Sequence, residues 1–143
     1  MGGIQTENYV EGESAMVKRY DVDNVRSPGG RFSHVGEIGP NSQVFHLAGQ
    51  TGTAPDGTIG ETIEEQVKLV YQNIRTVLNE CGMGLENIAK ITVYLTSPDY
   101  IETHRAIQQN ALGGVVPAST LLIVSRLARP ELLVEVEAVA AID

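Results

Sequence analysis

Apolar side chains recur every three or four residues in the middle of the chain, which predicts an amphipathic helix there. Thr62 and Glu65 fit a capping box at its start, in which the threonine hydroxyl and the glutamate carboxylate bond to backbone N–H groups that the first helical turn leaves free. Gly82 is placed to end the helix, because glycine adopts the left-handed backbone that closes many helices. The apolar stripe between these ends consists of Val67, Val70, Tyr71, Ile74, Val77 and Leu78.

Alternating or continuous apolar runs predict six strands around this helix. A second helix is expected over residues 97–114, because Ser97 suits a helix cap and Pro98 the first helical position. The Gly-Pro-Asn sequence at 39–41 suits a chain reversal and predicts a hairpin. The predicted strands lie at residues 17–22, 32–38, 42–50, 91–96, 119–127 and 132–142.

The order of these elements predicts an α+β fold with a mixed sheet and two helices. Two helices can cover only one face of a sheet of this size, so apolar positions on the other face would stay in contact with water. We therefore expect the chain to self-associate. Residues 16–143 are predicted to form a single domain, and residues 1–15, which hold three glutamates and no lysine or arginine, a flexible N-terminal extension.

Charge and cysteine content narrow the classes of function. The 143 residues include 10 Lys and Arg against 18 Asp and Glu, a formal net charge of −8, which makes nucleic acid a poor partner. The single cysteine, Cys81, excludes an internal disulfide and favours a cytoplasmic setting. No apolar run is long enough to span a membrane and the polar start does not resemble a signal peptide, so we expect neither secretion nor membrane insertion.

Two carboxylates stand out in the last predicted strand. Glu135 and Glu137 are two positions apart, so their side chains share one face of the strand. Their place between apolar residues favours a carboxylate that binds or activates water. A solvated strand face would give the same spacing, and the pattern alone leaves both interpretations open.

The remaining chemistry-bearing residues indicate no metal or cofactor. His34, His46 and His104 are scattered without the spacing of shared metal ligands. The glycine-rich stretches lack the lysine and hydroxyl residues of a phosphate loop, although Gly49 would let a ligand approach the backbone closely. Cys81 lies at the predicted end of a helix, away from a helix N-terminus or a fixed cation that would activate a thiol, so we assign it no catalytic role.

Five motifs, taken together, resemble the reactive-intermediate deaminase family, also called RidA or YjgF. The resemblance covers roughly residues 26–142 in order and spacing, and implies a chorismate-mutase-like α+β fold. It also implies a homotrimer with a central barrel and ligand clefts between adjacent subunits. The motifs are GRFSH at 30–34, VFHLAGQ at 44–50, VPAST at 116–120, SRL at 125–127 and VEVEAVA at 134–140.

The resemblance implies a hydrolase that converts enamines and imines to 2-oxo acids and ammonia without a metal or organic cofactor. The glutamate that positions the attacking water in active relatives corresponds to Glu135. The family's arginine, which clamps a substrate carboxylate bidentately, is replaced by Ser119. Because a hydroxyl supplies neither the charge nor the fork, the resemblance implies an altered substrate. Whether Arg31, Arg126 or a neighbouring subunit supplies another cation stays open.

Further substitutions accompany this one in the implied cleft. Phe32 stands where the family has a tyrosine, Ala48 where it has a serine, and His104 where it often has an asparagine. We expect a metal-free hydrolase in which Glu135 orients water and other cleft residues shape substrate choice. The alternative is a non-catalytic trimer that binds a small metabolite or a partner protein; ribonuclease action is disfavoured by the negative charge. The expected substrate-binding residues are Phe32, Gly49, His104, Ser119 and Leu121.

Overall fold

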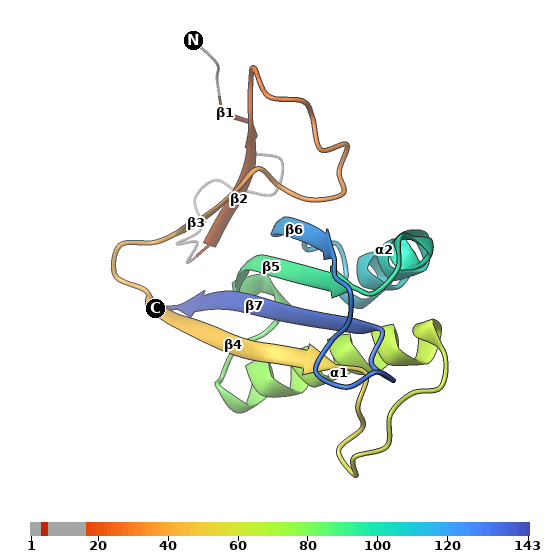
Figure 1. Cartoon of the computed structure of the whole chain (residues 1–143). Coiled ribbons are helices and arrows are strands. Elements are labelled where there is room, and N and C mark those ends of the chain that lie inside the picture. The colour runs from red at the N-terminus through yellow and green to blue at the C-terminus, as the bar shows by residue number, and fades with distance from the viewer. Residues whose placement is uncertain (1–3, 6–16) are drawn as a thin grey trace.

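Strands and helices follow the predicted order in the computed structural model, which describes residues 4–5 and 17–143 (Figure 1). The α+β fold class is therefore confirmed. Of the predicted extension at 1–15, only residues 4–5 are described, as strand β1, and the rest lies outside the described residues. The strands are β1 (Ile4–Gln5), β2 (Val17–Val22), β3 (Val35–Ile38), β4 (Gln43–Thr51), β5 (Ile88–Leu95), β6 (Ala118–Ile123) and β7 (Val134–Ile142), and the α-helices are α1 (Ile63–Glu80) and α2 (Ile101–Ala111).

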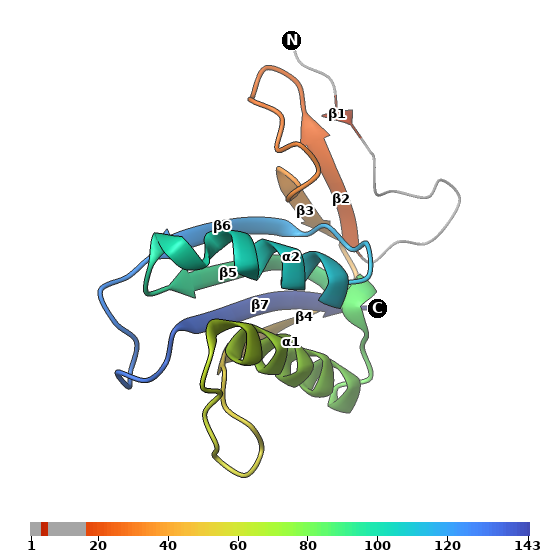
Figure 2. The same ribbon diagram turned by 90° about the vertical axis from the view of Figure 1, so that its right-hand side faces the viewer.

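The main sheet has four strands in the order β4-β7-β5-β6. β7 runs antiparallel to both β4 and β5, whereas β6 is parallel to β5, so the sheet is mixed as predicted. Figures 1 and 2 show α1 and α2 side by side on the same face of this sheet. The opposite face, here called the open face, carries no helix of the described residues.

β1, β2 and β3 form a separate small antiparallel sheet at one end of the main sheet (Figure 2). Val17 of β2 packs with Ala89 of β5 and Ala141 of β7 in a small apolar cluster. The buried Arg19 side chain adds a polar connection, because its Nε donates a hydrogen bond of 3.0 Å to the backbone oxygen of Ile88. These contacts hold the N-terminal strands against the main sheet.

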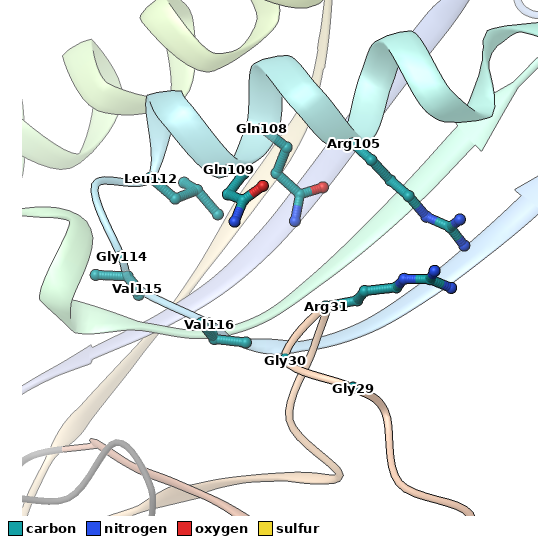
Figure 3. Close-up of a pocket in the computed structure, with 10 residues that line it drawn as sticks. All are labelled: Gly29, Gly30, Arg31, Arg105, Gln108, Gln109, Leu112, Gly114, Val115 and Val116. Carbon is teal, nitrogen blue, oxygen red and sulfur yellow. The ribbon is translucent and has the colours of Figure 1, made fainter.

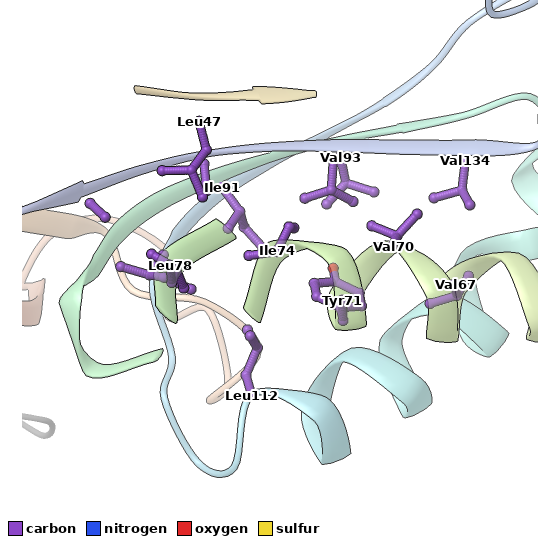
Figure 4. Packing of buried hydrophobic residues seen from close by; sticks show 14 of the residues in the cluster. Leu47, Val67, Val70, Tyr71, Ile74, Leu78, Ile91, Val93, Leu112 and Val134 are labelled. Atoms are coloured by element: carbon purple, nitrogen blue, oxygen red, sulfur yellow. The ribbon is translucent and has the colours of Figure 1, made fainter. Parts of the chain in front are cut away.

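The hydrophobic core lies between the two helices and the main sheet (Figure 4). The predicted stripe of α1 faces it, and all of that stripe except the partly buried Val77 is buried. The sheet contributes apolar residues from alternate positions, including Ile91, Val93, Val134 and Val136, each 0% or 1% exposed. Pairing of these strands buries their inward side chains and turns the others toward the open face.

Both ends of α1 form through the predicted residues. The Thr62 hydroxyl accepts a 3.1 Å hydrogen bond from the Glu65 backbone N–H. The Glu65 carboxylate accepts from the N–H of Glu61 at 2.8 Å, one residue earlier than a capping box predicts. At the other end, Gly82 has φ +76° and the N–H of the next residue, Met83, donates to the Leu78 oxygen at 2.8 Å, as in a Schellman motif.

Three predicted strands are shorter in the structure, of which β7 loses least and begins at Val134 rather than at residue 132. β3 begins at Val35 rather than at residue 32, because Ser33 donates its N–H to the Pro117 oxygen at 3.0 Å. The predicted hairpin is wrong, because β3 pairs with β2 and β4 pairs with β7, so the turn at 39–41 carries the chain from the small sheet to the main sheet. β6 ends at Ile123 rather than at residue 127, and the Arg126 side chain donates to the backbone oxygens of Leu127 and Ala128 in the following loop. Within the described residues, no helix combines the length and apolar character needed to cross a membrane.

Candidate functional site

Glu135 and Gly49 meet where β7 pairs with β4. The pairing is regular up to Leu47, shifts, and resumes with Gln50 opposite Val136 and Thr51 opposite Glu135. A Cβ at Gly49 would overlap the Glu135 carboxylate and would lie 2.8 Å from its Cδ. The shift and the missing side chain together let this carboxylate lie directly against the β4 backbone. A larger residue at position 49 would therefore displace the Glu135 carboxylate from this position.

The two carboxylates on the open face of β7 have different surroundings. Tyr94 of β5 donates its hydroxyl to Glu137 at 2.8 Å. This hydrogen bond to Glu137, more than burial or the nearby negative charges, raises the pKa of Tyr94. No residue in the ranges 4–5 and 17–143 donates a hydrogen bond to Glu135, which is half-buried. Glu135 therefore has acceptor positions for a water or a ligand, whereas Glu137 is held by Tyr94.

Ser119 and Leu121 of β6 lie on the other face of the sheet. Ser119 pairs with Ile91, whose side chain is in the core, and Leu121 packs against that core. Residues opposite one another in paired strands point to the same side, so Ser119 also faces the helices. Glu135, flanked by the buried Val134, points the other way. Within one chain, the sheet therefore lies between Ser119 and Glu135.

Phe32 lies at the edge of β6. The following residue, Ser33, forms a parallel bridge with Ala118 and donates its hydroxyl to the Val116 oxygen at 2.6 Å. The Phe32 ring contacts His34 edge-on, with ring centroids 6.4 Å apart. These contacts place the 30–34 motif against the 116–120 motif, although the two are far apart in the sequence.

His104 lies between the two helices, apart from the other expected substrate-binding residues. It is 1% exposed, and its Nε2 is 2.7 Å from the hydroxyl of Tyr71 on α1. Burial, with a smaller effect from the charge of Arg105, lowers the pKa of His104 to about 4, so the ring is neutral at pH 7. Its Nδ1 is buried and has no hydrogen-bond partner within the described part of the chain.

The other residues considered from the sequence have structural or surface positions. His34 is held on both sides, by the Val22 N–H at Nδ1 and by the Arg26 oxygen at Nε2. His46 and Cys81 are exposed. Among residues 4–5 and 17–143, no three His, Cys, Asp or Glu side chains gather where they could hold a metal ion.

A cleft of about 340 Å³ opens between α2 and the loop before β3 (Figure 3). Sequence reasoning missed its α2 residues, although positions 105, 108, 109 and 112 have the spacing of one helix face. The predicted site residues do not line this cleft, but it adjoins two of them, because Arg31 precedes Phe32 and Val116 lies close before Ser119. Arg126 is not part of it. The lining residues are Gly29, Gly30, Arg31, Arg105, Gln108, Gln109, Leu112, Gly114, Val115 and Val116.

Known proteins resemble this chain in sequence and in fold. The family model described as endoribonuclease L-PSP matches residues 24–142. A RutC family protein from Pyrococcus abyssi is 35% identical over 111 residues, which cover 72% of this chain and 87% of the relative. TdcF from Escherichia coli K12, named as a candidate reactive intermediate deaminase, is 24% identical over 123 residues, 83% of this chain and 94% of TdcF.

Among solved structures, YyfB from Yersinia pestis is described as a protein of unknown function in the conserved Rid family. It matches with a TM-score of 0.81 and 26% identity, over 89% of this chain and 99% of YyfB. The family match spans every motif that suggested the resemblance, and the two helices on one face of a mixed sheet agree with it. The chain belongs to the RidA/YjgF family, whose members are described either as reactive intermediate deaminases or as endoribonucleases.

Proposed function

We propose that this protein is a RidA-like hydrolase that releases ammonia from an enamine, an imine or a related small metabolite. The observation that carries the proposal is the Glu135 carboxylate, which lies against the backbone of Gly49 and accepts no hydrogen bond from the described residues. A half-buried carboxylate with free acceptor positions can orient a water molecule. No metal or organic cofactor is part of the proposal.

The proposed reaction needs only water and the substrate. The oxygen of a water held by Glu135 attacks the carbon of the C=N bond, and one proton of that water passes to the carboxylate. Glu135 returns this proton to the nitrogen, which gives a carbinolamine. The carbinolamine hydroxyl then gives its proton to the nitrogen through Glu135, the carbon–nitrogen bond breaks, and ammonia leaves. The carbon keeps the oxygen as a carbonyl group, so water and imine are converted to carbonyl and ammonia without an oxidant or reductant.

We place the reaction in a cleft between two subunits of a homotrimer. This proposal is supported by the position of Ser119 and Glu135 on opposite faces of the sheet. The two residues can line one cleft only if Ser119 comes from one subunit and Glu135 from another. Exposed apolar residues on the open face, Val44 at 48% and Leu122 at 44%, favour contact with another copy. Light scattering on the purified protein tests the trimer, and a monomer would contradict it.

Substrate choice in this proposal differs from that of relatives with the family arginine. Phe32, Gly49, His104, Ser119 and Leu121 are the residues that we propose to shape it. His104 would act from within the helix layer, because the structure gives it no open surface. The cytoplasmic location also stays a prediction.

An ammonia-release assay over a panel of enamines and imines, including aminomuconate-like compounds, tests the activity. Glu135→Gln should lower the rate about 100-fold or more, in the range that a positioned acid–base group contributes. Glu137→Gln is the matched control, because Glu137 lies on the same strand face and is held by Tyr94. We expect it to retain most of the rate. No turnover across the panel, or an equal loss in both variants, would contradict the proposal.

The alternative, a trimer that binds a small metabolite or a partner protein without turnover, is favoured by one observation. Ser119 gives the family's arginine position no charge, so a standard 2-imino acid would lose its clamp. This alternative predicts that a ligand raises the melting temperature without being consumed. It also predicts that Glu135→Gln leaves this stabilisation unchanged.

A further inference from the structure

Two arginines line one end of the cleft between α2 and the loop before β3. Figure 3 shows the guanidinium groups of Arg31, from the loop, and Arg105, from α2, at the same end. Arg31 makes no ion pair or side-chain hydrogen bond with any described residue. Arg105 pairs with Glu102 at 3.1 Å, and the Glu102 side chain is 87% exposed. Two cations therefore line this end of the cleft, and the carboxylate that pairs with one of them, Glu102, lies outside the lining and projects into water.

Two amides add hydrogen-bond donors beside these cations. The Gln108 oxygen accepts a 3.1 Å hydrogen bond from Tyr71, whose hydroxyl is also bonded to the buried His104. That bond turns the Gln108 nitrogen away from Tyr71, and Figure 3 shows the nitrogens of Gln108 and Gln109 directed toward the cleft. The donor orientation at Gln108 is thus set by a hydrogen-bond chain that begins inside the protein.

The rest of the lining is neutral. Leu112, Val115 and Val116 supply apolar surface, and no Asp or Glu of the described residues lines the cleft. The whole chain carries a net charge of −8, so this concentration of cations and donors runs against its average character. The volume of about 340 Å³ lies within the range of small-molecule sites and exceeds what a bare oxyanion fills.

We infer that this cleft binds the phosphate group of a small phosphate monoester. Near pH 7 such a group carries a charge of about −1.5 to −2 and three acceptor oxygens, enough to bridge two guanidinium groups. A monocarboxylate, with one charge and two oxygens, matches only one of them. The apolar residues would contact the organic part. The inference deepens the proposed function, and rests on it for the claim that the bound ester is a substrate, since Arg31 and Arg105 would replace the missing cation at Ser119.

Calorimetry on the assembled protein with glycerol 3-phosphate, glycerate and glycerol tests the binding. We expect glycerol 3-phosphate to bind about tenfold or more tightly than glycerate, with no binding of glycerol. Because the second ionisation of a phosphate monoester lies near pH 6, its affinity should rise from about pH 5 to pH 7. Equal affinity for glycerate would overturn the inference. Inorganic phosphate that binds as tightly as the ester would restrict the cleft to the free ion and overturn it as well.

Variants then test which residues hold the phosphate. Arg31→Ala and Arg105→Ala should each weaken binding about tenfold or more, and the corresponding lysine variants less, since they keep the charge and lose the fork. Arg129→Ala is the control, because Arg129 pairs with Glu131 in an exposed loop outside the cleft. Unchanged affinity in both alanine variants, with melting temperatures matching the unmodified protein, would overturn the inference.

Two further variants separate this inference from the proposed function. Glu102→Ala removes the one carboxylate that competes for Arg105, so it should tighten binding severalfold; weaker binding would contradict the assignment. Glu135→Gln should bind the ester normally while losing turnover. If turnover still depends on Glu135 but the ester does not bind, the phosphate cleft is refuted and the proposed hydrolase is not. Ester binding that needs both arginines, without turnover of any substrate, would refute the hydrolase and leave the binding site in place.

Discussion

Replacing Gly49 by alanine should displace the Glu135 carboxylate while leaving the fold intact. The added Cβ would lie 2.8 Å from Cδ and 3.0 Å from Cγ of Glu135, whereas carbon atoms pack at about 3.5 to 4.0 Å. The carboxylate must therefore withdraw by about 0.7 Å or more. Displacements near 1 Å can lower enzymatic rates about 100-fold, so we expect a loss of about 10- to 100-fold in ammonia release.

Stability should change little in the same variant. The atoms that must move belong to the end of a half-buried, flexible side chain, and Gly49 does not have a positive φ, so alanine is not strained there. We expect the free energy of unfolding in urea to change by about 1 kcal/mol or less. Gly57→Ala is the opposite control, because Gly57 has φ +91° and open space around it. It should lose about 1 kcal/mol of stability and retain its rate.

Two results would refute this reasoning. The first is a Gly49→Ala variant that keeps the full rate. The second is a loss of rate in a variant whose crystal structure shows the Glu135 carboxylate in its original position. Either would mean that contact between Gly49 and Glu135 does not set the position of the reactive water.

Three other variants test separate parts of the structure. Tyr71→Phe removes the partner of the buried His104 and should lower the free energy of unfolding by about 1 to 3 kcal/mol in urea titrations. Tyr94→Phe, which removes a solvent-exposed hydrogen bond, should lower it by less than about 0.5 kcal/mol, and equal losses would contradict this. Folding lowers the pKa of His104 from 6.5 to about 4, so His104 contributes about 3 kcal/mol to the free energy of unfolding above pH 6.5. This contribution is lost as the pH falls from about 6.5 to about 4. His104→Gln should flatten the dependence of stability on pH in this range, and an unchanged slope would show that another group causes it. Ser119→Arg restores the family arginine and should raise the rate on carboxylate-bearing imines about tenfold or more, so an unchanged rate would place the substrate away from β6.

Local patterns predicted the elements well where each depends on residues close in sequence. The stripe and ends of α1 follow from side-chain spacing, one hydroxyl and one glycine, all within a single segment. The predicted start of the 32–38 strand was wrong because it depends on residues far away in the sequence. Ser33 bonds to residues 116 and 117, and no local pattern shows that its backbone has a partner so far along the chain.

The sequence named candidate site residues but could not predict how they are arranged in space. Family motifs identified Glu135, Gly49, Phe32 and Ser119 as residues to examine. They could not show that Glu135 and Ser119 face opposite sides of one sheet, because that depends on how β7 and β6 pair with β5. The buried position of His104 likewise depends on how α2 packs against α1.

By itself, the sequence determined the α+β class, the order of elements from Val17 onward, the ends of α1 and the family. These follow from periodicity, capping and short motifs, which act over a few residues. Only the tertiary structure decided that Glu135 is free while Glu137 is held, and that Arg31 and Arg105 share a cleft. The physical reason is that charge and hydrogen-bonding act over a few ångströms in space, and folding sets those distances between residues that are far apart along the chain.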